Sequence, residues 1–109
     1  MVENDIMRGI LLADERAPST NELAAMYGIN PNTAAKSLTT LTNDGILYKK
    51  RGVGMFVAPG AKEKILDKRR RKFADEYLMP MVREARLLGL DTAEICTMIE
   101  QYMEDENEA

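Results

Sequence analysis

A chain of 109 residues with 45% hydrophobic and 30% charged side chains is expected to form one small domain, or one small domain with an appendage, and lies outside the range of disordered proteins. One cysteine and no histidine exclude an intramolecular disulfide, a Cys/His zinc set and an imidazole base, so we expect neither an enzyme nor a cofactor. No apolar run is long enough for a membrane span, and Glu3, Asp5 and Arg8 interrupt the start where a signal peptide would be apolar, which predicts a cytoplasmic protein without a membrane partner.

The net charge of −3 is unevenly distributed along the chain. Residues 1–60 carry six basic and six acidic side chains, residues 61–72 carry seven basic against two acidic, and residues 73–109 carry two against ten. DNA attraction depends on the local field of the surface that meets the phosphates. The acidic C-terminal part therefore does not exclude DNA binding by the rest of the chain.

The first half of the sequence predicts three helices. Apolar residues at helical spacing indicate a packing helix over residues 3–12. A second helix is expected from Thr20 to Tyr27, since Ser19 and Glu22 form a capping box and Gly28 follows. The expected inner face of this helix consists of Leu23, Ala24 and Tyr27.

A third helix is expected to begin at Pro31, with Asn30 as its cap, and to end at the Asn43-Asp44-Gly45 sequence. Its predicted buried stripe is Ala34, Leu38 and Leu41. The opposite face is polar without any acid, which suits an anionic partner, and it carries Asn32, Thr33, Lys36, Ser37 and Thr40.

Two short strands, residues 46–49 and 55–58, are expected to form a hairpin whose link contains Gly52 and Gly54. Its tip carries Lys49, Lys50 and Arg51. Basic residues on a solvated edge strand explain this pattern as well as DNA binding does, but the polar third helix favours DNA. The order of elements predicts a mainly α fold with a small β-hairpin, a winged helix-turn-helix over residues 1–58.

After a hinge at Pro59-Gly60, a helical pattern continues to Gly89 and is interrupted by Pro80, which is expected to kink the helix or start a new one. A capping box at Asp91 and Glu94 predicts a last helix. In it, Cys96 is expected to be a small buried apolar residue rather than a redox sensor.

The tail, residues 61–109, has too little partner surface within one chain, which predicts a homodimer. The expected dimerisation residues are Phe73, Tyr77, Met81, Val82, Ile95, Met98, Ile99 and Tyr102. A ligand pocket lined by some of these side chains is the alternative. The basic run Lys68–Lys72 is expected to be mainly solvated or paired with acids such as Asp67, Asp75 and Glu76, with a phosphate contact as the alternative.

Four motifs resemble the signature of the GntR family of bacterial transcriptional regulators: Pro18-Ser19-x-x-Glu22-Leu23-Ala24, Gly28-Ile29-Asn30-Pro31-Asn32-Thr33-Ala34-x-Lys36, Asp44-Gly45-Ile46-Leu47-Tyr48 and Arg51-Gly52-x-Gly54-Met55-Phe56-Val57. The tail motif Glu84-Ala85-Arg86-x-Leu88-Gly89 resembles the YtrA-like branch, whose members lack a large effector domain.

The resemblance implies DNA contacts for Ser19, Asn30, Asn32, Thr33, Lys36, Arg51 and Gly52, to which the basic tip adds Lys50. Asn21 belongs to the same expected contact set, although many relatives have an arginine there, which in them often reads a base. Ala35 offers a base little beyond contact with a thymine methyl group.

Together these patterns predict a homodimeric transcriptional regulator, specifically a repressor, that binds double-stranded DNA with a pseudo-palindromic operator. The resemblance further implies a neighbouring transport operon as the target, and a small-molecule effector is open. The alternative is a winged-helix protein-interaction module without specific DNA binding.

Overall fold

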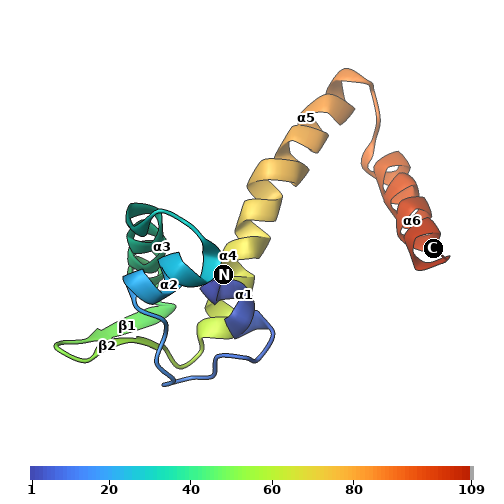
Figure 1. The fold of residues 1–109 in the computed structure, drawn as a ribbon. Coiled ribbons are helices and arrows are strands. Elements are labelled where there is room, and N and C mark those ends of the chain that lie inside the picture. The colour runs from blue at the N-terminus through green and yellow to red at the C-terminus, as the bar shows by residue number, and fades with distance from the viewer. Residues whose placement is uncertain (109) are drawn as a thin grey trace. The chain divides into compact units, whose positions relative to one another are not determined.

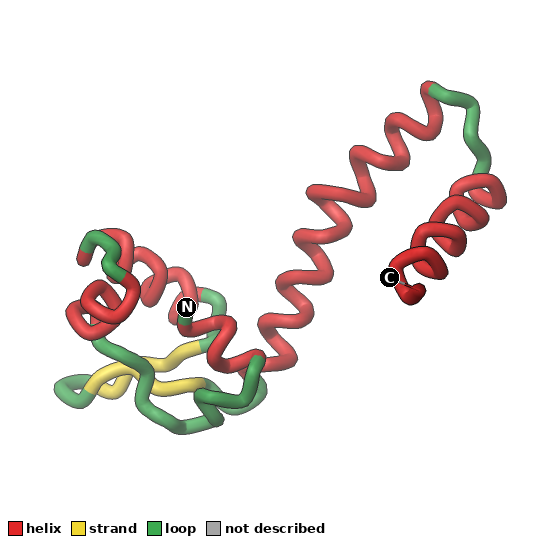
Figure 2. The backbone as a smooth tube through the Cα atoms, turned by 45° about the vertical axis from the view of Figure 1, so that its right-hand side comes forward, coloured by secondary structure: helices red, strands yellow, loops and turns green. Residues whose placement is uncertain are grey.

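The computed structural model describes residues 1–108, and the chain divides into two compact units, Met1–Arg69 and Arg70–Ala109. The fold is mainly helical with one two-stranded hairpin, as predicted (Figures 1 and 2). In chain order its elements are α1 (Val2–Met7), α2 (Thr20–Tyr27), α3 (Pro31–Asn43), β1 (Leu47–Lys50), β2 (Gly54–Val57), α4 (Ala61–Phe73), the π-helical turn η1 (Ala74–Leu78), α5 (Met79–Leu87) and α6 (Thr92–Glu108).

The first helix is shorter than the sequence indicates. α1 ends at Met7 rather than near residue 12, because Gly9 takes a left-handed φ of 76° and the amide of Ile10 turns back to donate to the carbonyl oxygen of Asp5 at 2.8 Å. Ile10 is exposed as a result, whereas Ile6 is buried. α1 therefore covers the core with a single apolar edge.

The second helix has the predicted bounds. The hydroxyl of Ser19 accepts from the backbone N–H of Glu22 at 3.2 Å, and the Glu22 carboxylate accepts from the backbone N–H of Ser19 at 3.3 Å. Gly28 ends the helix at φ 61°. Leu23 is fully buried as expected, but Tyr27 is 41% exposed, so its assignment to the inner face is wrong. Tyr27 is the last residue of α2, where the chain turns away at Gly28.

The third helix also begins where the sequence predicts. The side-chain oxygen of Asn30 accepts from the N–H of Asn32 at 2.8 Å, and Pro31 occupies the first helical position. Gly45 takes a φ of 75° just after the helix. The predicted stripe is confirmed, since α3 buries Ala34, Leu38 and Leu41.

The hairpin is displaced by one residue from the predicted strands, residues 46–49 and 55–58. Leu47 faces Val57, and Lys50 faces Gly54, the last pair before the turn. Ile46 precedes β1 because its amide donates to the carbonyl oxygen of Leu41 at the end of α3, although its own carbonyl oxygen accepts from the N–H of Ala58 at 2.9 Å. The position of β1 is thus fixed by α3 as well as by strand pairing.

A third extended segment pairs with the outer edge of β2. The N–H of Ala17 donates to the carbonyl oxygen of Met55 at 2.8 Å, and the N–H of Val57 donates to that of Glu15 at 2.9 Å. Arg16 forms an isolated antiparallel bridge with Phe56. Strand β2 is therefore paired on both edges, which the sequence did not predict.

One hydrophobic core joins these elements in the first unit. Leu23, Leu38, Ile46, Leu47 and Val57 are each at most 2% exposed and come from α2, α3, the hairpin and the residue before it. Helix α4 closes this core with Ala61 and Ile65. Figure 1 shows α2 and α3 on one side of the hairpin, with α1 and the start of α4 beside them.

In the second unit, Pro80 follows the π-helical turn η1 and lies in the first turn of α5. The sequence predicts that Pro80 kinks the helix or starts a new one; the backbone stays helical at Leu78 and Met79, and the α-helical pattern resumes at Met79 after the π turn. Helix α5 ends at Leu87, and Gly89, two residues later, takes a φ of 70°. The capping box of α6 is present, with Glu94 N–H donating to Asp91 at 2.8 Å.

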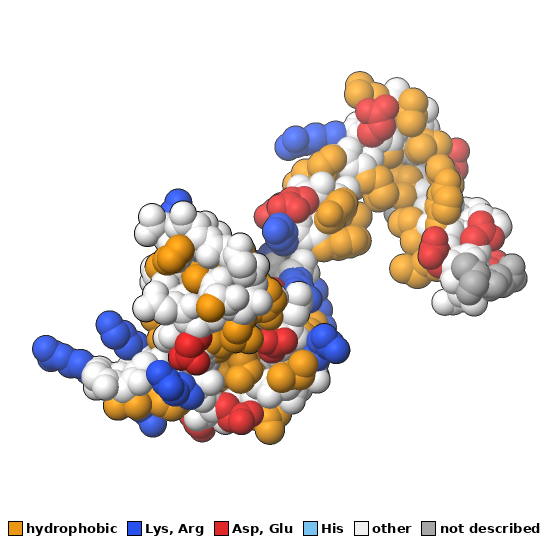
Figure 3. Space-filling view, in the orientation of Figure 1, with side chains coloured by type: hydrophobic (Ala, Val, Ile, Leu, Met, Phe, Trp, Pro, Cys, Tyr) orange, Lys and Arg blue, Asp and Glu red, His pale blue; other side chains and the backbone are white. Residues whose placement is uncertain are grey.

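The second unit has almost no interior of its own. Within residues 70–107 the single buried residue is Ala85, and Figure 3 shows hydrophobic side chains gathered on the surface of this part. Cys96 is exposed, so its expected burial is wrong for the isolated chain. The physical reason is that α6 has too few apolar neighbours in the chain to cover its stripe.

Candidate nucleic-acid interface

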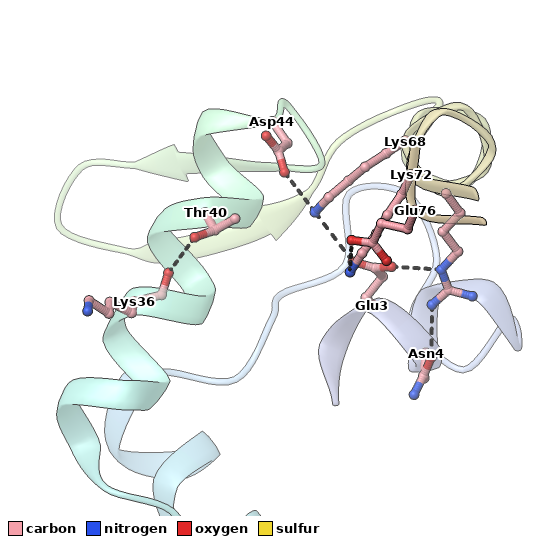
Figure 4. Close-up of polar contacts among 9 residues, drawn as sticks. Glu3, Asn4, Lys36, Thr40, Asp44, Lys68, Lys72 and Glu76 are labelled. Atoms are coloured by element: carbon pink, nitrogen blue, oxygen red, sulfur yellow. Dashed lines mark hydrogen bonds and ion pairs between the residues drawn. The ribbon is translucent and has the colours of Figure 1, made fainter. Parts of the chain in front are cut away.

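Helix α3 presents an acid-free polar face. Asn32, Thr33 and Lys36 are exposed on it, and neither this face nor the rest of the helix contains Asp or Glu. The hydroxyl of Thr40 donates to the carbonyl oxygen of Lys36 at 2.9 Å, while the Lys36 side chain extends away from the helix (Figure 4). Asn30 already uses its side-chain oxygen as the cap, so its amide N–H groups are what it can offer a phosphate.

The amino end of α2 lies in the same unit. The hydroxyl oxygen of Ser19 accepts from the Glu22 amide, and Asn21 is exposed. Hydrogen bonds from the hydroxyl and backbone of Ser19 lower the pKa of Glu22, with a smaller contribution from Arg16. The partial positive charge of the helix end favours an anion here, and the capping carboxylate partly offsets it.

The wing, which is the hairpin formed by β1, β2 and the turn between them, carries basic residues both on its outer face and at its tip. The Lys50 ammonium lies 4.5 Å from the centroid of the Phe56 ring, which stacks on Tyr48 with centroids 5.8 Å apart. Such a cation–π contact contributes about 0.5–1 kcal/mol at an exposed site. Arg51 and Gly52 lie in the turn, and both are exposed, with Gly52 at φ 77°. Arg51 is therefore at the tip, whereas Lys50 lies over the outer face of the hairpin.

The outer face of the hairpin holds two charged residues that sequence reasoning missed. Tyr48 donates its hydroxyl to Asp14 at 2.7 Å, and this hydrogen bond raises the pKa of Tyr48. Arg16 lies close to Gly54 and forms an ion pair with Glu22 at 3.9 Å. These contacts depend on pairing between residues 14–17 and β2, which are about 40 residues apart in the chain, so local sequence patterns give no signal for them.

Part of the basic run is held by acids within the first unit (Figure 4). Lys68 Nζ lies 2.9 Å from Asp44 at the end of α3 and 3.8 Å from Glu3 on α1. Arg69 Nε lies 2.9 Å from Glu3, and its terminal nitrogen donates to the side-chain oxygen of Asn4 at 3.0 Å. The expected pairing is thus observed, but with partners that the sequence did not indicate, Glu3 on α1 and Asp44 directly after α3.

The second unit adds one of the expected pairs. Lys72 and Glu76 lie one helical turn apart, with 3.9 Å between Nζ and the carboxylate oxygen. Both side chains are more than half exposed, so the contribution of this pair to stability is small.

Two other kinds of site are not found in the described part of the chain. Residues 1–108 contain no group of three or more His, Cys, Asp or Glu side chains placed to hold a metal ion. None of the helices formed by these residues is long and apolar enough to cross a membrane.

Comparison with known proteins gives consistent matches. Residues 1–57 match the family described as bacterial regulatory proteins, gntR family. The HTH-type transcriptional regulator YhcF of Bacillus subtilis is 31% identical over 99 residues, which cover 91% of this chain and 80% of that protein. The HTH-type transcriptional repressor YtrA of the same organism is 26% identical, over 91% of this chain and 75% of that protein.

A solved structure shares both the fold and the sequence likeness. The crystal structure of a transcriptional regulator of the GntR family from Bacteroides thetaiotaomicron superposes with a TM-score of 0.80 at 32% identity and covers 96% of this chain and 91% of that chain. The likeness to these proteins therefore extends through the C-terminal helices.

Proposed function

We propose, on the premise that this chain belongs to the gntR family of bacterial regulatory proteins, that it is a repressor which binds a pseudo-palindromic operator as a homodimer in the cytoplasm. Family membership makes it a transcriptional regulator and not an enzyme. The observation that carries the proposal is the acid-free exposed face of α3, in the same unit as a wing whose tip carries Arg51.

Each expected contact has a chemical role in this proposal. Asn32 and Lys36 reach base edges or phosphates in the major groove, and Thr33 binds a phosphate. Arg51, beside Gly52, enters a minor groove. The remaining expected contacts support the docking through phosphates, and they are Ser19, Asn21, Asn30 and Lys50.

The tail supports self-association. Tyr77, Tyr102 and Met98 are 65%, 68% and 47% exposed, and these residues belong to amphipathic helices that bury one residue within positions 70–107. Figure 3 shows hydrophobic side chains gathered on this part of the chain, and exposed apolar surface of this kind marks an interaction site. A second copy supplies the same stripe, and two-fold symmetry would pair two copies of α3 with two half-sites. The functional division into residues 1–58 and 61–109 stays a prediction.

The regulatory signal belongs to the tail in this proposal. A cavity of about 340 Å³ lies between α5 and α6, and its lining includes Met81, Met98 and Tyr102. It could receive a small apolar effector or side chains of the second copy. YtrA is named a repressor, which supports repression as the mode of action. A neighbouring transport operon is the target that the resemblance of the tail motif to the YtrA-like branch implies.

Fluorescence anisotropy tests the DNA-binding part. The protein is titrated into a labelled duplex from upstream of its own gene, over a range of salt concentrations, with unrelated duplex as competitor. Tight, competitor-resistant and salt-sensitive binding is expected. Equal, weak binding to both duplexes would refute the proposal and leave a protein-interaction module as the function.

Sedimentation equilibrium tests the homodimer. Tyr102→Glu places a charge in the exposed apolar stripe of α6 and is expected to shift the dimer towards monomer. Gln101→Glu, at the exposed neighbouring position, is the matched control and is expected to leave the dimer intact. A monomeric wild-type protein, or equal effects of both variants, would argue against this interface.

A further inference from the structure

We infer that Arg16 is an additional DNA contact, which binds a backbone phosphate between the amino end of α2 and the wing. The inference rests on the proposed DNA-binding function. Arg16 belongs to neither the predicted recognition helix nor the hairpin, and only the tertiary pairing of residues 14–17 with β2 brings it to this position.

Backbone pairing determines the face on which Arg16 lies. Arg16 bridges Phe56, and Phe56 is the register partner of Tyr48. Side chains of directly opposed residues lie on the same face of a sheet. Arg16 therefore shares the outer face of the wing with the Tyr48–Phe56 stack, over which the Lys50 ammonium also lies. Two cations, Arg16 and Lys50, are thus placed on one face of the hairpin, together with the carboxylate of Asp14 that accepts from Tyr48.

Gly54 provides the surface against which the guanidinium packs. A Cβ atom at Gly54 would lie 3.1 Å from Nε of Arg16, and φ at this glycine is 140°, a value that other residues rarely adopt. The absence of a side chain lets the guanidinium approach the backbone at the point where the wing turn joins β2. The charge of Arg16 is therefore held beside the turn that carries Arg51.

The ion pair with Glu22 leaves the charge of Arg16 available. Its oxygen–nitrogen distance is 3.9 Å, and the two side chains are 56% and 57% exposed. Pairs of this length and exposure are weak, and Glu22 also accepts from the N–H of Ser19. A guanidinium presents a planar set of donors that matches phosphate oxygens. A phosphate bound here would also contact the positive end of α2.

Salt-dependent anisotropy on the operator duplex distinguishes this role from a structural one. Arg16→Ala is expected to reduce the slope of log Kd against log salt by about 0.9 for each chain bound, and to weaken binding about fivefold per chain at 0.15 M salt. Arg16→Lys keeps the charge and is expected to retain the slope. Arg8→Ala removes an exposed arginine at the end of α1 and serves as the matched control. Thermal denaturation of each variant measures any loss of folding.

A second background separates direct contact from neutralisation of Glu22. Glu22→Gln preserves the capping box, since glutamine also fills that position. In this background Arg16→Ala is expected to lower the slope by the same amount. The inference would be overturned if Arg16→Ala left the slope unchanged in the Glu22→Gln background. It would also be overturned if Arg16→Ala alone, like the control Arg8→Ala, had the slope of the wild type. Failure of the wild-type protein to prefer its operator would instead overturn the proposed function.

Discussion

Alanine substitutions of Lys68 and Arg51 are expected to separate a residue that stabilises the fold from one that contacts DNA. Lys68 Nζ is 2.9 Å from Asp44 and 3.8 Å from Glu3, and the Lys68 and Asp44 side chains are about one-third exposed. Each pair of this exposure contributes about 0.2–1 kcal/mol, so Lys68→Ala is expected to lower the free energy of unfolding by about 1 kcal/mol. For a folded unit of this size that corresponds to a fall in Tm of about 4–8 °C.

For DNA binding we expect Arg51→Ala to have an effect and Lys68→Ala to have none. Lys68 is held by Glu3 on α1 and by Asp44 directly after α3, so Lys68→Ala should leave the salt slope of operator binding unchanged. Arg51→Ala at the exposed wing tip should lower the slope by about 0.9 per chain bound. Arg51→Ala should change the free energy of unfolding by less than about 0.5 kcal/mol, since it is a surface substitution away from packed contacts.

Circular dichroism melting and salt-dependent anisotropy on the same preparations measure both quantities. Arg71→Ala, at an exposed position of α4, controls for the general effect of alanine in that helix. A fall in the salt slope with Lys68→Ala, together with an unchanged Tm, would show that the basic run meets DNA and would refute the assignment of Lys68 to internal pairing.

Three further outcomes follow from burial and capping. Ile65→Ala removes a fully buried side chain of α4 and should cost about 2–5 kcal/mol in urea unfolding; a cost below 1 kcal/mol would mean that α4 does not close the core. Asn30→Ala removes the cap of α3 and should cost about 1 kcal/mol by the same assay, and an unaltered midpoint would contradict the capping bond. Because hydrogen bonds from Ser19 lower the pKa of Glu22 below 4.5, its contribution to stability should be complete above pH 4.5 and lost as the pH falls through the lowered pKa. Unfolding curves of wild type and Glu22→Gln over this pH range should converge on acidification, and a constant difference would contradict the linkage.

The predictions that depended on neighbouring residues were the accurate ones. The Ser19–Glu22 box and the Asn30 cap with Pro31 define α2 and α3, because each motif satisfies amides within one helical turn. The wing was displaced by one residue, since the amide of Ile46 bonds to the end of α3 instead of entering the ladder. Burial predictions at Tyr27 and Cys96 were wrong, because burial depends on which other segments cover a position.

By itself the sequence determined the order of helices and hairpin, the acid-free face of α3 and the glycine-containing basic wing, because caps, turns and amphipathic spacing act over a few residues. Tertiary structure alone decided that residues 14–17 pair with β2 and place Arg16 on the wing, and that Glu3 and Asp44 neutralise Lys68. These contacts join residues about 24 to 65 positions apart, and they form only when burial of Leu38, Ile46 and Ile65 has brought the segments together.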